Sequence, residues 1–144
     1  VIAMALEAKH TDVVALGPDR ILPRAPKDLR AALGVEKVTV VADVVGGAYW
    51  PQLIDILERG GRYTCSGAIA GPMVTLDLRT FYLRDLTFTG STVIPPQVFA
   101  DVVAYIERCE VKPLLAATYP LHELREAQQV FIDKKHVGNI VVTP

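Results

Sequence analysis

Short apolar stretches alternate with amphipathic stretches along most of the chain. Apolar, β-branched stretches predict strands at Val1–Met4, Arg20–Leu22, Val38–Ala42, Arg62–Ser66, Leu86–Ser91 and Ile140–Val142. Helical spacing predicts helices at Lys9–Leu16, Asp28–Leu33, Trp50–Arg59, from Pro96 onward and at Leu121–Lys135. Such an alternation predicts an α/β fold with a mostly parallel sheet and helices on both faces.

Glycines mark the predicted ends of the helices. Gly60 and Gly61 follow the stretch Trp50–Arg59, where they are expected to end the helix before the next strand. Gly138 is expected to cap the helix at Leu121–Lys135 in the same way.

Three predicted strands also end in glycine, at Gly46, Gly67 and Gly90. Taken singly, each is a typical turn residue. In parallel α/β sheets, however, ligands bind beyond the carboxyl ends of the strands. The recurrence of glycine at this edge predicts a flat ligand across the strand ends.

Composition limits the classes of function. The chain has 144 residues, 51% of them hydrophobic, and a net charge of −1, which favours one soluble, cytoplasmic domain. Its basic residues are dispersed, so nucleic acid is not an expected partner. No apolar stretch approaches the roughly 18 residues of a membrane span. Cys65 and Cys109 are expected to be buried free thiols, and the histidines lie too far apart to predict a metal site.

Several motifs occur together in a specific order: Gly60-Gly61-Arg62, Ser66-Gly67-Ala68, Tyr82-Leu83-Arg84-Asp85-Leu86 before Gly90-Ser91-Thr92, and His136-Val137-Gly138-Asn139-Ile140. Together they resemble the carboxyl-terminal, nucleotide-binding part of zinc-independent, quinone-oxidoreductase-like medium-chain dehydrogenases. The resemblance implies an incomplete doubly wound Rossmann-type sheet over residues 1–144. It lacks the first, fingerprint strand, and the catalytic GroES-like domain is absent.

The resemblance also implies where a nicotinamide cofactor binds. Backbone groups of Ser66, Ala68, Ser91 and Val93 would hold the carboxamide. Gly46 would pass near the ribose, and Gly67 would leave space for the ring, so that valine there is expected to block binding with little effect on the fold. Asn139 replaces a basic residue that reaches the pyrophosphate, and its contact should be weaker because it brings no charge.

The end of the first strand is expected to choose between NADP and NAD. Ala5 aligns with the acidic residue that binds the ribose in NAD-dependent relatives, and His10 aligns with a lysine near a 2′-phosphate. Both favour NADP. Glu7 lies two residues after Ala5 and would accept the ribose hydroxyls if the strand end shifted, so NAD stays an alternative.

The implied function is hydride transfer between NAD(P)H and a carbonyl, alkene or quinone, with no catalytic residue in this chain. Two alternatives remain open: an inactive scaffold or self-association module, and the nucleotide-binding domain of a zinc-dependent alcohol dehydrogenase. A homodimer through the edge strand at Leu86–Thr89 is expected, as in the family.

The absent fingerprint strand would lie between Val1–Met4 and Val38–Ala42. Unpaired backbone groups along two buried edges would cost on the order of 1–3 kcal/mol each. Val1–Met4 is therefore expected to pair directly with Val38–Ala42, or a strand of another chain to fill the space.

Overall fold

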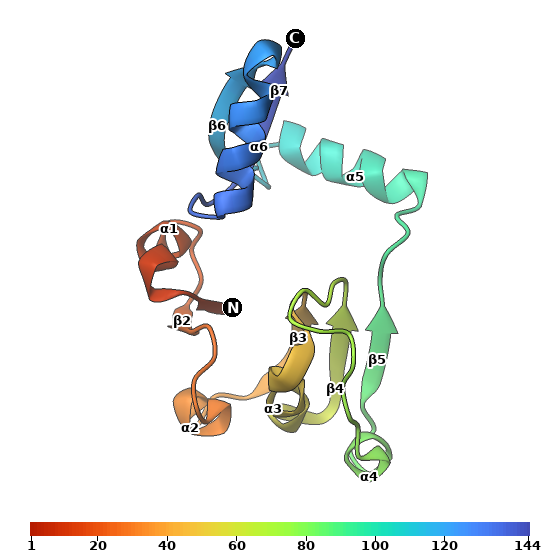
Figure 1. Ribbon diagram of the computed structural model, residues 1–144. Coiled ribbons are helices and arrows are strands. Elements are labelled where there is room, and N and C mark those ends of the chain that lie inside the picture. Colours follow the sequence, from red (N-terminus) through yellow and green to blue (C-terminus); the bar gives the residue numbers. More distant parts are fainter. The chain divides into compact units, whose positions relative to one another are not determined.

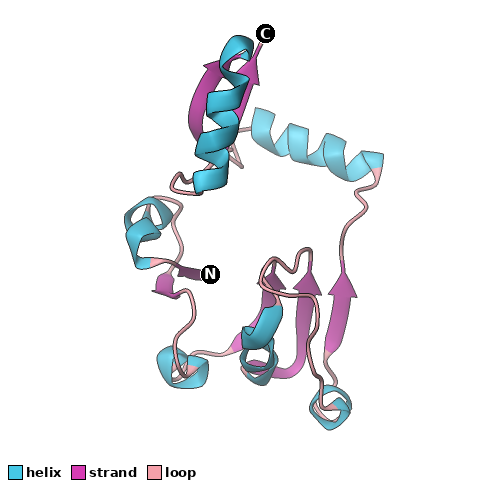
Figure 2. Cartoon of the chain, in the orientation of Figure 1, coloured by secondary structure: helices cyan, strands magenta, loops and turns pink.

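The computed structural model describes residues 1–144, which form two compact units (Figure 1). Unit 1 comprises Val1–Val13 and Gly17–Val93, and unit 2 comprises Val14–Leu16 and Ile94–Pro144. Both contain parallel strands and helices, as the cartoon shows (Figure 2).

The first 93 residues carry five strands and six short helices. The strands are β1 (Ile2–Ala5), β2 (Arg20–Pro23), β3 (Val38–Asp43), β4 (Leu57–Cys65) and β5 (Thr87–Gly90). The helical elements are η1 (Glu7–Lys9), α1 (His10–Val14), α2 (Leu29–Leu33), η2 (Gly47–Tyr49), α3 (Trp50–Asp55) and α4 (Leu78–Tyr82). Helix α4 was not predicted; it begins after Asp77, whose carboxylate accepts the Arg79 amide.

Unit 1 contains two parallel sheets, β1–β2 and β3–β4–β5. In the larger sheet, Asp43 is the register partner of Cys65, and Cys65 is the partner of Gly90. The three strands therefore end at one edge of the sheet, where their arrowheads lie in Figure 1. This confirms the prediction of parallel strands whose glycine-bearing ends share an edge.

One hydrophobic core joins both sheets of unit 1. Its buried side chains come from β2, α2, β3, α3, β4 and the start of β5: Leu22, Leu29, Leu33, Val41, Trp50, Ile54, Ile56, Leu57, Tyr63 and Leu86. The rings of Trp50, Tyr63 and Phe88 meet edge to face, with centroids 5.5–5.9 Å apart. Such aromatic contacts add to the stabilisation from buried apolar area.

The predicted direct pairing of Val1–Met4 with Val38–Ala42 is wrong. β1 pairs only with β2, and β3 pairs only with β4. The two sheets are joined instead through helices: the Leu29 amide donates to Gln52 Oε1 (2.9 Å), and the Tyr49 hydroxyl donates to the Pro26 carbonyl (3.1 Å). One edge of β1 and one edge of β3 therefore have no strand partner within the chain, and a strand of another chain in this place stays a prediction.

Helix α3 is shorter than the predicted Trp50–Arg59. It ends at Asp55, and Leu57 already pairs with Val38 in the sheet. Leu57 is buried in the strand. A buried strand and the buried face of a helix both need an apolar side chain, so the spacing of Leu57 from Trp50 does not distinguish helix from strand.

The glycines after α3 lie within β4 and do not cap a helix. The pairing of β3 with β4 shifts register between Val38 and Val40. Within this irregular stretch Gly60 has a φ of 74°, and its amide donates to the Arg84 carbonyl (2.8 Å). A β-carbon on Gly61 would lie 2.8 Å from the Glu58 carbonyl. Both glycines therefore serve a bulge in the strand.

Unit 2 holds a long helix and a small parallel sheet. Its elements are α5 (Pro96–Glu107), β6 (Leu115–Pro120), η3 (Leu121–Glu123), α6 (Leu124–Asp133) and β7 (Asn139–Thr143). β6 pairs with β7 and was not predicted. Lys134, with a φ of 54°, ends α6, so the predicted cap at Gly138 is wrong. Gly138 instead allows close backbone contact, because a β-carbon at this position would lie 2.8 Å from the Leu114 carbonyl oxygen.

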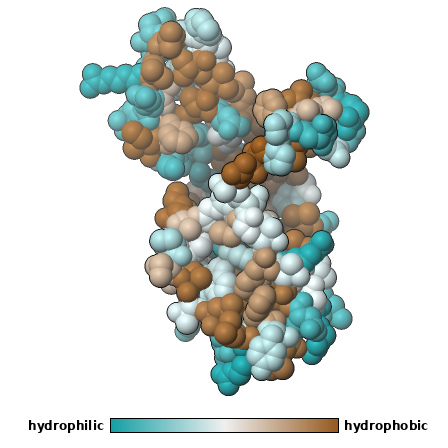
Figure 3. Space-filling model, turned by 90° about the vertical axis from the view of Figure 1, so that its right-hand side faces the viewer, coloured by the Kyte–Doolittle hydropathy of each residue, from teal (hydrophilic) through white to brown (hydrophobic).

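Hydrophobic side chains reach the surface in several places (Figure 3). In unit 2 they include Phe99 on α5 and Phe131 and Ile132 on α6. No helix has the length and apolar character that crossing a membrane requires.

Candidate functional site

The loops after β3 and β4 are hydrogen-bonded to each other. The Ala70 amide donates to the Val45 carbonyl (2.8 Å), and the Gly47 amide donates to the Gly71 carbonyl (2.9 Å). The sheet ladder continues into this region, because the Ser66 amide donates to the Asp43 carbonyl (3.0 Å). The two strand ends therefore form one paired structure.

Close backbone approach explains the glycines in this pair of loops. Gly47 has a φ of 74°, and a β-carbon there would lie 2.7 Å from the Ala70 carbonyl. A β-carbon on Gly46 would lie 3.0 Å from the Gly71 carbonyl. Without side chains, the two loops come into contact.

Gly67 also meets protein backbone. A β-carbon on Gly67 would lie 2.9 Å from the Val44 carbonyl. The expectation that valine at this position would leave the fold intact is therefore wrong: the side chain would first collide with the neighbouring loop.

The end of β5 is open by contrast. A β-carbon on Gly90 would meet no atom within 4 Å. The next residue is tied to the sheet, since the Ser91 amide donates to the Cys65 carbonyl (2.9 Å). Val93 is exposed. A side chain at position 90 would thus meet no neighbouring protein atom, in contrast to one at Gly46, Gly47 or Gly67.

Unused hydrogen-bond donors lie at these strand ends. The amides of Gly67, Ala68 and Val93 donate no hydrogen bond within the chain. Exposed backbone amides at the carboxyl ends of parallel strands are suited to bind oxygen atoms of a ligand. The structure thereby brings Gly46, Gly67 and Ala68 together on adjoining loops, with Ser66 and Ser91 at the neighbouring strand ends.

A buried carboxylate lies beneath the loops. Asp43 accepts hydrogen bonds from the amides of Val45 (2.7 Å) and Gly46 (3.1 Å) and from the Tyr63 hydroxyl (2.8 Å). Burial, together with the bond to Asp43, raises the pKa of Tyr63 above its ordinary value. Sequence analysis did not identify Asp43. The available signal was an acidic residue at the end of an apolar strand, directly before a Gly-Gly turn.

Ala5 and His10 lie together at the end of β1. Nε2 of His10 is 3.1 Å from the Ala5 carbonyl oxygen, a bond that the ring donates when protonated at Nε2. Glu7 begins η1 and is exposed. Ala5 belongs to the β1–β2 sheet, which is separate from the sheet β3–β4–β5, and Glu7 and His10 follow it in η1 and α1.

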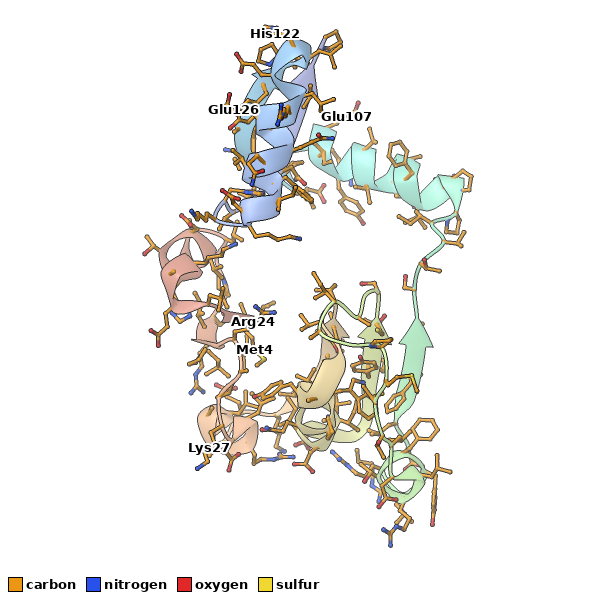
Figure 4. The ribbon with its side chains drawn as sticks, in the orientation of Figure 1. Met4, Arg24, Lys27, Glu107, His122 and Glu126 are labelled. Atoms are coloured by element: carbon orange, nitrogen blue, oxygen red, sulfur yellow. The ribbon has the colours of Figure 1, made fainter.

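Arg24 is a further basic residue at this edge. Ala5 pairs with Pro23, so Arg24 follows the end of β2 next to the end of β1, near Met4 (Figure 4). Its side chain is exposed and makes no hydrogen bond or ion pair within the chain. Sequence analysis missed it because its proximity to Ala5 depends on the strand register.

Asn139 lies in unit 2, at the start of β7. Its backbone amide donates to the Leu114 carbonyl (2.8 Å), and its Nδ2 donates to the same oxygen (3.3 Å). Both nitrogens are engaged within unit 2.

Comparison with known proteins identifies the family. The family described as zinc-binding dehydrogenase matches residues 16–142, nearly the whole chain. This chain belongs to that family. It corresponds to the carboxyl-terminal part of a medium-chain zinc-type dehydrogenase/reductase.

Solved structures of zinc-type dehydrogenases share the fold. A putative alcohol dehydrogenase from Sinorhizobium meliloti is 41% identical, with a TM-score of 0.88 over 99% of this chain and 41% of that protein. A cobalt- and zinc-bound thermostable alcohol dehydrogenase from Pyrobaculum aerophilum is 30% identical, with a TM-score of 0.82 over 100% of this chain and 42% of that one.

Among curated relatives, an acryloyl-coenzyme A reductase from Sulfurisphaera tokodaii is 29% identical over 74% of this chain. The match covers 32% of that enzyme. The chain thus spans about a third of the length of this relative.

The family name implies zinc, but these residues do not fit a zinc site. The chain holds no group of three or more His, Cys, Asp or Glu side chains that could bind a metal ion. Cys65 is half-buried, with its thiol 3.3 Å from the Gly67 carbonyl. Cys109 is exposed just after α5, so its predicted burial is wrong. Neither thiol is part of a ligand set.

Proposed function

We propose that this chain is the nicotinamide-binding portion of an NAD(P)-dependent oxidoreductase. The observation that carries the proposal is the shared edge of β3, β4 and β5, where the amides of Gly67, Ala68 and Val93 have no acceptor within the chain. Membership of the dehydrogenase family supports a dinucleotide as the ligand. A bound cofactor would donate hydride to, or accept it from, a carbonyl, alkene or quinone substrate, and the protein would orient the cofactor.

The nicotinamide carboxamide suits these strand ends chemically. It carries one carbonyl oxygen and one amino group, so it needs a donor and an acceptor. In this proposal the Ala68 and Val93 amides donate to its oxygen, and backbone carbonyls at Ser66 and Ser91 accept from its nitrogen. Gly46 and Gly67 have no side chains, which leaves space for the ribose and the nicotinamide ring beside the loops. Ser91 is already fixed to Cys65, which limits the ordering that binding would require.

NADP is the preferred dinucleotide in this proposal. Ala5 offers no carboxylate to repel a 2′-phosphate, and His10 lies at the same strand end. Arg24 adds a guanidinium without a protein partner, and arginine binds phosphate through paired, charge-assisted hydrogen bonds. NAD is the alternative, in which the exposed Glu7 accepts the ribose hydroxyls.

The zinc-independent, quinone-oxidoreductase-like branch remains the proposed subtype. Its support is the run Tyr82–Leu86 with Gly90-Ser91-Thr92. A mycobacterial quinone oxidoreductase shares the fold, with a TM-score of 0.83 at 22% identity. The zinc-dependent alcohol dehydrogenase branch is the second candidate, favoured by the 30% identity to the cobalt- and zinc-bound Pyrobaculum enzyme. A cytoplasmic homodimer joined through β5, the edge strand of its sheet, is part of the proposal.

Calorimetric titration tests the proposed function. NADPH and NADH are titrated into the 144-residue chain and into a longer protein that adds a relative's amino-terminal part. Saturable binding by both proteins, tighter for NADPH, supports a cofactor domain. Binding only by the longer protein, or by neither protein, favours the scaffold alternative and contradicts the proposal. Tighter binding of NADH would overturn the preference for NADP.

A further inference from the structure

The carboxylate of Asp43 is almost completely enclosed. The residue is 5% exposed and lies at the last position of β3. Its Oδ1 accepts the Val45 amide, and its two oxygens share the Gly46 amide at 3.1 and 3.2 Å. Oδ2 also accepts the Tyr63 hydroxyl at 2.8 Å.

No cation balances this carboxylate. None of the ion pairs in the structure includes Asp43. Its partners are two amides and one hydroxyl, and hydrogen bonds to an ionised acceptor are roughly twice as strong as neutral ones. A buried carboxylate that accepts only such donors fixes their positions closely.

Tyr63 connects the carboxylate to the core. It lies on β4, and its ring meets Trp50 and Phe88 edge to face, with centroids 5.8 and 5.5 Å away. Packing against Trp50 and Phe88 therefore fixes the ring of Tyr63, and its hydroxyl donates a hydrogen bond to Oδ2 of Asp43. The position of Asp43 depends on the core of unit 1 as well as on its own loop.

The loop held by Asp43 holds the second loop in turn. Val45 donates its amide to Asp43, and its carbonyl accepts the Ala70 amide (2.8 Å). Gly47, one residue beyond Gly46, donates to the Gly71 carbonyl (2.9 Å). Continuous hydrogen bonds therefore run from the core through Tyr63 and Asp43 to the loop that contains Gly67 and Ala68.

We propose that Asp43 is a positioning residue of the candidate site and acts with Tyr63 to hold both strand-end loops in place. This inference rests on the proposed function in one respect, namely that the amides of Gly67 and Ala68 bind the cofactor. Asp43 itself is enclosed and would not contact the cofactor. It would affect binding only by fixing the positions of the two loops.

Amide hydrogen exchange in the 144-residue chain tests the positioning without a ligand. Tyr63→Phe removes one hydroxyl bond and keeps the packed ring. Exchange at the Gly47 and Ala70 amides should then accelerate about fivefold or more, because one net hydrogen bond to a charged group is lost. Tyr49→Phe is the matched control: Tyr49 lies in η2, two residues after Gly47, and its hydroxyl also makes one hydrogen bond, but to the Pro26 carbonyl and not to Asp43. It should leave exchange at both amides unchanged.

Asp43→Asn is the stronger variant. It keeps the side chain's shape but places an amino group against one of the donors, so loop exchange should exceed that of Tyr63→Phe. Should this variant fail to fold, Tyr63→Phe still decides the question. The proposal is overturned if Tyr63→Phe leaves Gly47 and Ala70 unchanged, or if Tyr49→Phe accelerates them equally.

NADPH titration of the same variants separates this inference from the proposed function. Tyr63→Phe should weaken NADPH binding about threefold to tenfold, and Tyr49→Phe should not weaken it. If the unsubstituted chain binds no NADPH, the proposed function fails, while the exchange measurement still decides whether Asp43 positions the loops. If the chain binds and Tyr63→Phe binds equally well, the positioning role is refuted and the proposed function stands.

Discussion

The sheet β3–β4–β5 in unit 1 and the sheet β6–β7 in unit 2 differ in how deeply their side chains are buried. Both sheets are parallel, and each has a neighbouring helix with apolar and polar side chains, α3 in unit 1 and α6 in unit 2. In the first, Val41, Leu57 and Tyr63 are buried among aromatic and aliphatic side chains. In the second, Leu115 and Val141 are exposed, and Ala127 on α6 is the one hydrophobic residue of unit 2 that is fully buried.

This difference shows that a parallel strand pair can form with little burial, whereas the burial of its side chains depends on which distant segments cover it. A helix or a sheet is stabilised mainly by packing of its apolar face. Unit 1 has two sheets and several helices around one core. Most apolar side chains of unit 2 are exposed, so we expect them to contribute little stability to this chain.

The largest expected effect comes from matched leucines in the two sheets. Leu57 in β4 is 1% exposed, and Leu115 in β6 is 62% exposed. Leu57→Ala should lower the free energy of unfolding by about 2–5 kcal/mol, since it leaves a cavity. Leu115→Ala should change it by less than about 0.5 kcal/mol. Urea denaturation followed by far-UV circular dichroism, which reports helices and strands of both units, measures both variants, and equal losses would show that the two regions do not differ in packing.

The glycines at the strand ends give the next effect. Gly67→Ala should destabilise by about 1–3 kcal/mol, because its β-carbon would be only 2.9 Å from the Val44 carbonyl. Gly90→Ala, with open space around it, should change stability by less than about 0.5 kcal/mol. Thermal unfolding compares them. A Gly90→Ala loss as large as that of Gly67→Ala would refute the close contact between the paired loops.

The buried phenol gives the sheet of unit 1 a specific pH dependence. Tyr63 has its pKa raised from the ordinary 10.0, so above pH 10 the unfolded chain loses this proton first. The folded state then binds more protons, and its stability falls as pH rises, by up to about 1 kcal/mol between pH 10 and 11. Denaturant titrations of the unsubstituted chain and of Tyr63→Phe should converge over this range. Parallel curves would contradict the shift.

Exposed ion pairs should not distinguish the two units. Arg59 and Asp85 in unit 1 are 2.7 Å apart, and Arg108 and Glu110 in unit 2 are 2.5 Å apart, all largely in solvent. Arg59→Gln and Arg108→Gln should each change stability by at most about 0.5 kcal/mol. A double-mutant cycle in low and high salt measures each pair. A coupling well above about 1 kcal/mol in either unit would contradict this equivalence.

The parts predicted correctly from sequence are those with local signals. The β-branched stretch Val38–Ala42 identified β3, and the glycines at 46, 67 and 90 located one edge of the sheet. β6 was missed because Leu115–Pro120 mixes alanine, threonine and proline without a clear period. Its strand exists through pairing with β7, which lies more than twenty residues later.

Site details depended on contacts that the sequence does not contain. The role of Asp43 required the distance to Tyr63, and that of Arg24 required the register of β1 with β2. The pairing of the strand-end loops also showed that Gly67 is in close contact with backbone, since a β-carbon there would lie 2.9 Å from the Val44 carbonyl. In each case the partner lies on another element.

Backbone amide mapping by NMR tests the central claim most directly, namely that the strand ends of β3–β4–β5 bind a nicotinamide dinucleotide. We predict that NADPH, added to the 144-residue chain, shifts the amide signals of Gly46, Gly67, Ala68, Ser91 and Val93 in a saturable way. The absence of shifts at these strand ends, or shifts confined to unit 2, would contradict the claim.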